Sequence, residues 1–123
     1  MRFFGIIGSL SLFLSVALGA FGAHALRDQL SERMREVFET AVRYQMIHSI
    51  TILIAGILVS RGAFFQYAGW LYIVGILLFS GSLYLLAVTN IRTLGMITPL
   101  GGLAFLAGHF LLILGFWRLQ SST

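Results

Sequence analysis

The 123-residue chain lacks cysteine and lysine altogether, and it has a single proline, Pro99, and only four acidic residues. The lack of cysteine excludes disulfides, thiolate nucleophiles and thiolate metal ligands. The four carboxylates lie between Asp28 and Glu39. None is therefore placed in an apolar segment to orient a histidine for nucleophilic catalysis, or to exchange protons with a transported solute. We predict a protein that is not an enzyme, with no catalytic residue, no bound metal and no cofactor.

Apolar residues are abundant where charge is scarce. Hydrophobic residues make up 59% of the chain and charged residues 10%, with a mean hydropathy of +0.96. Soluble domains are about 45–50% apolar and about 25% charged, so this surface requires lipid as its solvent. The net charge of +4 comes from arginines scattered singly at the ends of apolar runs, which is typical of membrane anchors. We expect the lipid bilayer of the cell membrane as the surroundings, and no nucleic-acid partner.

Four apolar runs are long enough to cross a membrane, since about 20 helical residues span the ~30 Å hydrocarbon core. The predicted spans cover residues 3–25, 44–60, 67–89 and 94–117 of one transmembrane domain, residues 1–123. The last two connections are short, which forces antiparallel neighbours. The fold class is therefore predicted as an all-α, integral membrane, up-and-down four-helix bundle. The first run also resembles a cleavable signal peptide, but it is long for one and no domain requiring export follows, so we expect it to be retained.

The segment from Arg27 to Arg43 carries all four acidic residues and four of the eight arginines. Ser31 is placed to cap a helix there. Apolar residues recur in the segment at helical spacing, at Leu30, Met34, Val37, Phe38 and Ala41. This pattern predicts an amphipathic helix at about residues 31–43, lying along the membrane surface between spans one and two. The alternative is a plain solvated loop.

Arginine placement also predicts the orientation of the chain. The side that holds the long loop has five arginines and the other side has three: Arg27, Arg33, Arg35, Arg43 and Arg92 against Arg2, Arg61 and Arg118. Cytoplasmic loops are enriched in basic residues. We therefore predict that the long loop is cytoplasmic and that both termini lie outside.

Polar residues near one end of the first two spans form the candidate site. Gln45 and His48 are three residues apart and share a helix face, and His24 ends span one on the same side. Because polar groups in hydrocarbon must be paired, we predict a polar cluster of His24, Arg43, Gln45 and His48. It is interpreted either as interhelical hydrogen bonding or as a proton relay, ligand or ion site. His109 is predicted roughly 20 Å below that interface, which argues against a three-histidine zinc site.

Small residues predict where the helices approach one another closely. In span one they recur at every fourth position, at Ser11, Ser15 and Gly19. In span four, glycines recur at every seventh position, at Gly101, Gly108 and Gly115. At the start of span three, Tyr67, Trp70 and Tyr72 are clustered as in an interfacial aromatic belt.

Four segments together resemble a known family. They are GAFGAHAL (residues 19–26), RYQMIHS (43–49), FSGSLYLLAVT (79–89) and ITPLGGLAFLAGH (97–109). In this order they are similar to the small uncharacterised membrane proteins typified by bacterial YgdD and YwdK. The resemblance implies a multi-pass membrane protein of about this length with no established activity. His109 departs from the family pattern, in which a tryptophan is expected.

Two functions from different classes follow from these patterns. The first is a non-enzymatic interaction or accessory component of the membrane, in which the polar cluster ties spans one and two together. Its partner would be a second copy of the chain, as a homo-oligomer, or another membrane protein. The alternative is a small-solute transporter or channel in which histidine and glutamine side chains form a polar gate.

Overall fold

The computed structural model of the protein describes residues 2–121. The first helical run comprises α1 (Arg2–Ala17), a π-helical turn (Leu18–Gly22) and α2 (Ala23–Ala25). The second comprises α3 (Glu32–Leu58) and a 3-10 turn (Val59–Arg61), and the third comprises α4 (Ala63–Gly75), a π-helical segment (Ile76–Ser80) and α5 (Gly81–Thr89). A 3-10 turn (Arg92–Met96) leads into α6 (Thr98–Ser121). The described chain is thus helical throughout except for its short connections, which confirms the all-α class.

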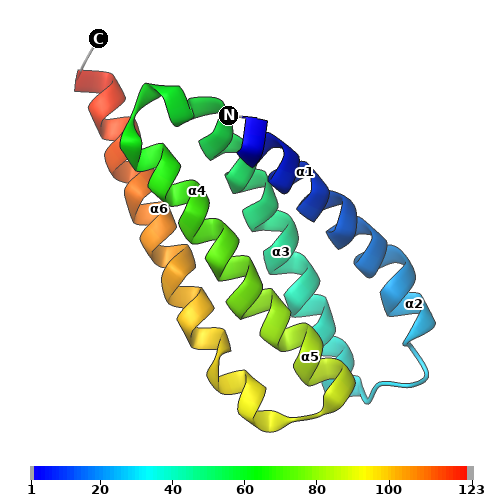
Figure 1. The fold of residues 1–123 in the computed structure, drawn as a ribbon. Coiled ribbons are helices and arrows are strands. Elements are labelled where there is room, and N and C mark those ends of the chain that lie inside the picture. Colours follow the sequence, from blue (N-terminus) through cyan, green and yellow to red (C-terminus); the bar gives the residue numbers. More distant parts are fainter. Residues whose placement is uncertain (1, 122–123) are drawn as a thin grey trace.

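The four runs are antiparallel to their neighbours and lie side by side (Figure 1). α1 packs mainly against α3, α3 also packs against α4 and α5, and α6 packs mainly against α4. α3 and α4 are therefore central, while α1 and α6 form the two edges. The amino-terminal end of α1 and the carboxyl-terminal end of α6 lie at the same end of the molecule (Figure 1).

All four runs can cross a bilayer. The spans Arg2–Gly22, Glu32–Arg61, Ala63–Thr89 and Arg92–Leu119 contain 21, 30, 27 and 28 residues, with mean hydropathies of 1.5 to 2.2. At 1.5 Å per residue even the shortest covers the ~30 Å hydrocarbon core. Their apolar side chains face outward in large numbers; Phe13 is 71% exposed and Leu77 is 68% exposed. Such a surface is stable only against lipid or another membrane helix.

The segment at residues 31–43 is helical, and the Ser31 hydroxyl accepts a hydrogen bond from the Met34 amide at 3.2 Å, as a helix cap does. The structure differs from our expectation in one respect, because this segment is the first part of α3 and is not a separate helix along the membrane surface. No glycine or proline interrupts the chain between Glu32 and Ala55 to bend the helix. Its apolar face instead packs inside the protein.

That inner face belongs to a small apolar cluster at one end of the bundle. Phe38 and Val42 of α3 are buried against Ala87 and Tyr84 of α5 and against Leu18 of the first run. The Phe38 and Tyr84 rings meet edge to face, with centroids 5.3 Å apart. Because α3 is about 45 Å long with its 3-10 turn, its charged first turns extend beyond the hydrocarbon core.

Aromatic residues and glycines interlock where α4 and the π-helical segment Ile76–Ser80 meet α6. Phe65, Tyr72 and Phe79 stand at every seventh position of the third run, opposite Gly115, Gly108 and Gly101 of α6. A methyl group on Gly108 would lie 2.7 Å from the Tyr72 ring, and one on Gly115 would lie 2.8 Å from the Phe65 ring. The Tyr72 and Phe65 rings thus fill the space that a missing side chain leaves, and Gly101 lies directly against the backbone of Phe79. Such contacts allow the close helix approach typical of membrane proteins.

Candidate functional site

The first buried polar network is centred on Gln45 of α3. Its Nε2 donates to the Ser11 carbonyl at 3.1 Å and lies 3.2 Å from the Ser11 hydroxyl. Its Oε1 accepts a 2.6 Å hydrogen bond from the Tyr84 hydroxyl. The Ser49 hydroxyl, one turn further along α3, lies 2.6 Å from both the Ser11 hydroxyl and the Gln45 carbonyl. Gln45 therefore joins α3 to α1 on one side and to α5 on the other.

The second network is centred on His48, one turn beyond Gln45 on α3. His48 Nε2 lies 3.1 Å from Nε2 of His109 on α6, and His109 Nδ1 lies 2.8 Å from the Tyr72 hydroxyl of α4. His48 Nδ1 lies 2.8 Å from the carbonyl oxygen of Tyr44. The His48 ring also stacks on the Phe105 ring, with centroids 3.5 Å apart and planes 6° from parallel. This network links α3, α4 and α6.

The partners of the second network fix the tautomer of both neutral histidines. The Tyr44 carbonyl can only accept, so His48 Nδ1 must donate and its Nε2 carries the lone pair. His109 must then donate from Nε2, which leaves its Nδ1 to accept from the Tyr72 hydroxyl. All hydrogen bonds point the same way, from Tyr72 towards Tyr44. This series of hydrogen bonds ends at the backbone carbonyl of Tyr44, which cannot pass a proton onward.

Together the two networks make α3 the helix to which the other three runs are attached. Gln45 bonds the first and third runs, whereas His48 bonds the fourth run and, through His109, the third. Among the described residues no buried side-chain nitrogen or oxygen lacks a hydrogen-bond partner. The described part of the chain also contains no group of three or more histidine, aspartate or glutamate side chains able to hold a metal ion. The arrangement therefore suits structural hydrogen bonding.

The predicted cluster of His24, Arg43, Gln45 and His48 does not form as one site. His24 is exposed on α2 and lines a surface pocket, and Arg43 is exposed on α3. Gly22 lies against Phe38, so His24 stands about ten residues, or roughly 15 Å, away from His48 along α3. Gln45 and His48 are both buried, 6% and 4% exposed, but bond different neighbours.

The predicted separation of His48 and His109 is wrong, since the two imidazoles are hydrogen-bonded. His48 is 16 residues beyond the start of α3, about 24 Å, because α3 starts well before the predicted span. His109 is only 11 residues beyond the start of α6 at Thr98, about 17 Å. Span two was predicted to start too late and span four too early. The two histidines were therefore predicted at different depths, although they lie at the same depth in the bundle.

Sequence reasoning also missed Tyr72 and Tyr84 as members of the networks. Tyr72 was placed in an interfacial belt, yet its side chain is fully buried, whereas Tyr67 and Trp70 are 58% and 47% exposed. Phe65, Ala68, Tyr72 and Gly75 are all buried and recur at helical spacing. That periodicity was the available signal that Tyr72 faces inward.

The predicted small-residue seams lie at helix contacts. Ser15 is fully buried in α1, and its hydroxyl donates to the Leu12 carbonyl at 2.8 Å. A methyl group on Gly19 would lie 3.1 Å from Val42 of α3. On α6, Gly101 meets the Phe79 backbone, with its added methyl 2.8 Å from the Phe79 Cα.

The apolar helices and internally paired polar groups define a multi-pass membrane protein. The chain belongs to the family described as protein of unknown function (DUF423), which matches residues 18–102. It is 46% identical to UPF0382 membrane protein SH2409 of Staphylococcus haemolyticus over 96% of this chain and 98% of that protein. It is 42% identical to UPF0382 membrane protein YwdK of Bacillus subtilis over 92% of this chain and 94% of that protein. These relatives confirm the resemblance seen in the sequence.

The comparison extends over nearly full length. UPF0382 membrane protein SSP2132 of Staphylococcus saprophyticus is 42% identical over 97% of this chain and all of that protein. No solved structure matches the chain. The family therefore supports the membrane class.

Coupling between Gln45 and Tyr84 provides a test of the first network. Tyr84→Phe is expected to destabilise the protein by about 1 kcal/mol, because it leaves Gln45 Oε1 without its donor. In the background of Gln45→Leu the same change should cost little, since the acceptor is then already absent. A double-mutant cycle of thermal or denaturant unfolding in detergent measures this coupling. Additive effects of the two changes would contradict the network.

Proposed function

We propose that this protein is a non-enzymatic, multi-pass component of the cell membrane that acts through interaction with other membrane-embedded molecules. The observation that supports this proposal most strongly is that, across residues 2–121 as the structure describes them, each buried side-chain nitrogen or oxygen has a hydrogen-bond partner. A catalytic or solute-binding site keeps polar groups available for its substrate. Here those groups are used to hold four runs of helix in one arrangement.

The edge helices offer the surfaces for such interaction. Only 17% of the most apolar stretch of the first run, and likewise of the fourth, is buried within the chain, against 33% for the run that contains α3. Phe13 of α1 and Phe110 of α6 are 71% and 59% exposed. Aromatic side chains of this size dominate helix and protein interfaces once they are covered. A second copy of the chain or another membrane protein would cover them.

The proposed orientation places the loop between α2 and α3 in the cytoplasm. The five arginines on that side outnumber the three at the end that holds both termini. The arginine side chains at the ends of the runs are exposed, and the enrichment of basic residues in cytoplasmic loops supports this placement.

Photo-crosslinking in intact membranes tests the interaction proposal. A photoreactive phenylalanine analogue in place of Phe13 or Phe110 should give discrete protein adducts, including a homodimer-sized adduct if the partner is a second copy. The matched control is the same analogue at Leu77, which is 68% exposed on the central third run. Adducts with lipid alone at both edge positions would contradict the proposal.

A small-solute transporter is the second candidate, because one lateral groove reaches the Gln45 network. This groove, of about 200 Å³, is lined largely by aliphatic side chains, with Ser11 and Gln45 among its lining residues. Flux of protons and small solutes through proteoliposomes distinguishes the two functions. The interaction proposal predicts the leak of protein-free vesicles, whereas a gate predicts flux that is altered by Gln45→Leu.

A further inference from the structure

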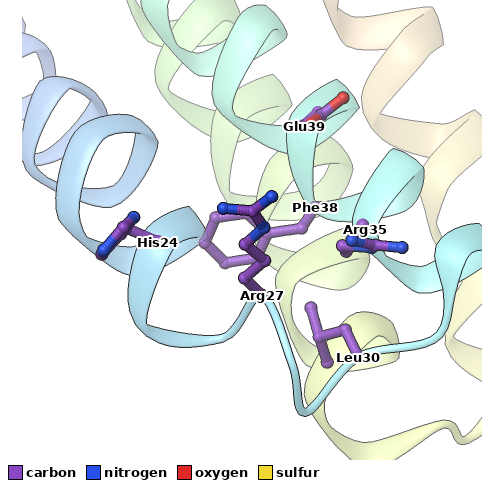
Figure 2. Close-up of a pocket in the computed structure, with 6 residues that line it drawn as sticks. All are labelled: His24, Arg27, Leu30, Arg35, Phe38 and Glu39. Atoms are coloured by element: carbon purple, nitrogen blue, oxygen red, sulfur yellow. The ribbon is translucent and has the colours of Figure 1, made fainter.

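A pocket of about 270 Å³ opens where the chain passes from α2 into α3 (Figure 2). It is lined by His24, Arg27, Leu30, Arg35, Phe38 and Glu39. None of these residues takes part in the hydrogen bonds of the Gln45 or His48 networks. The pocket contains His24, a member of the predicted cluster that takes no part in the buried networks.

Positive charge predominates in this pocket. Arg27 and Arg35 bring two guanidinium groups and His24 an imidazole, while Glu39 supplies the single carboxylate. In Figure 2 the Arg27 side chain extends between His24 and Arg35, in front of the Phe38 ring. Both arginines are exposed, and within the described part of the chain neither is engaged in an ion pair. Their donors are thus available to an anion.

The rest of the lining is apolar and held in place. The Phe38 side chain is 3% exposed and packs beneath Gly22, where an added methyl would lie 3.2 Å from the ring. Leu30 adds a second apolar side chain. The pocket thus combines a basic mouth with an apolar wall, at the end of α3 that extends beyond the hydrocarbon core. A basic mouth suits the phosphate of a phospholipid, and an apolar wall suits the adjoining glycerol region.

We propose that this pocket binds the phosphate of an anionic phospholipid headgroup. Guanidinium groups match phosphate oxygens through paired N–H donors, which makes arginine the favoured residue for this contact. Basic pockets between membrane helices bind anionic headgroups in this way. The His24 imidazole has an N–H to donate in either protonation state. Glu39 weakens binding of the anion, so its removal should strengthen it.

Native mass spectrometry of the detergent-purified chain, titrated with phosphatidylglycerol or phosphatidylcholine, tests the proposal. Wild type should retain phosphatidylglycerol in preference to phosphatidylcholine. The Arg27→Gln, Arg35→Gln double variant should bind phosphatidylglycerol at least about tenfold more weakly, since charge-assisted hydrogen bonds are lost. Lysine at both positions should restore binding in part, because the charge returns without the paired donors. Glu39→Gln should bind more tightly.

The matched control removes two arginines at the same end of the molecule but outside this pocket. Arg33→Gln with Arg92→Gln changes the net charge equally, and both residues line a different pocket. This control should bind phosphatidylglycerol as wild type does. Equal losses in the two double variants would overturn the proposal, because attraction would then be general. Binding of inorganic phosphate, added alone, without binding of phosphatidylglycerol would likewise overturn the assignment to lipid.

Discussion

Gly101→Ala is expected to destabilise the protein by about 2–3 kcal/mol, as overpacking does in a closely packed interior. The added methyl would lie 2.8 Å from the Cα of Phe79 and closer still to its backbone nitrogen. Because these are backbone atoms, no rotamer change can relieve the overlap, and α6 must move away from the third run. Unfolding in detergent, followed by the fluorescence of Trp70 and Trp117, measures the loss.

The adjacent glycine is a closely matched control. A methyl on Gly102 would lie 3.9 Å from the Phe79 ring, an ordinary contact distance. Gly102→Ala should therefore cost nothing, and the better helix propensity of alanine could stabilise the protein by up to about 1 kcal/mol. Equal stability of the two variants would show that α6 does not approach the third run as closely as described.

His48→Ala is expected to destabilise the protein by about 2–4 kcal/mol. The change removes the ring that stacks on Phe105 and leaves a cavity in its place. It also leaves the His109 Nε2–H without its acceptor inside the membrane. Unfolding of the purified variant in detergent measures the effect, and retention of helical circular dichroism shows that the variant has folded.

The control for His48→Ala is its neighbour in sequence. Ile47 is 47% exposed on the outward face of α3, so Ile47→Ala removes apolar surface that only lipid or detergent covers. That change should cost well under 1 kcal/mol. If His48→Ala unfolded at the same temperature as Ile47→Ala and wild type, that result would contradict a structural role for the histidine pair.

The sequence was sufficient to predict four long apolar helices in an antiparallel bundle, because membrane helices must satisfy their own backbone and be long enough to cross. The glycine repeat of α6 was also visible. Its counterpart, the aromatic repeat of Phe65, Tyr72 and Phe79, was equally present in the sequence. The aromatic repeat was not recognised as the partner of the glycine repeat, because matching the two requires knowledge of how the two helices are aligned along their length.

The candidate site was predicted less completely, for the same physical reason. Gln45 and His48 were identified because polar side chains in hydrocarbon need partners. Which partners they find depends on relative depth, and depth depends on where each helix starts. α3 starts well before the predicted span two, so His48 reaches His109 and His24 stays at the surface.

We infer that α3 holds the other three runs through paired polar groups in an interior without water. Single cysteines in this cysteine-free chain, tested for thiol labelling in intact cells, examine that claim directly. Cysteines that replace the fully buried residues Ala41, Ile52 and Ala55 should resist water-soluble reagents. Cysteines that replace Asp28 and Thr93, in the exposed connections, should react once the membrane is permeabilised. A continuous labelled stripe through the buried positions of α3 would contradict the account and favour a permeation pathway.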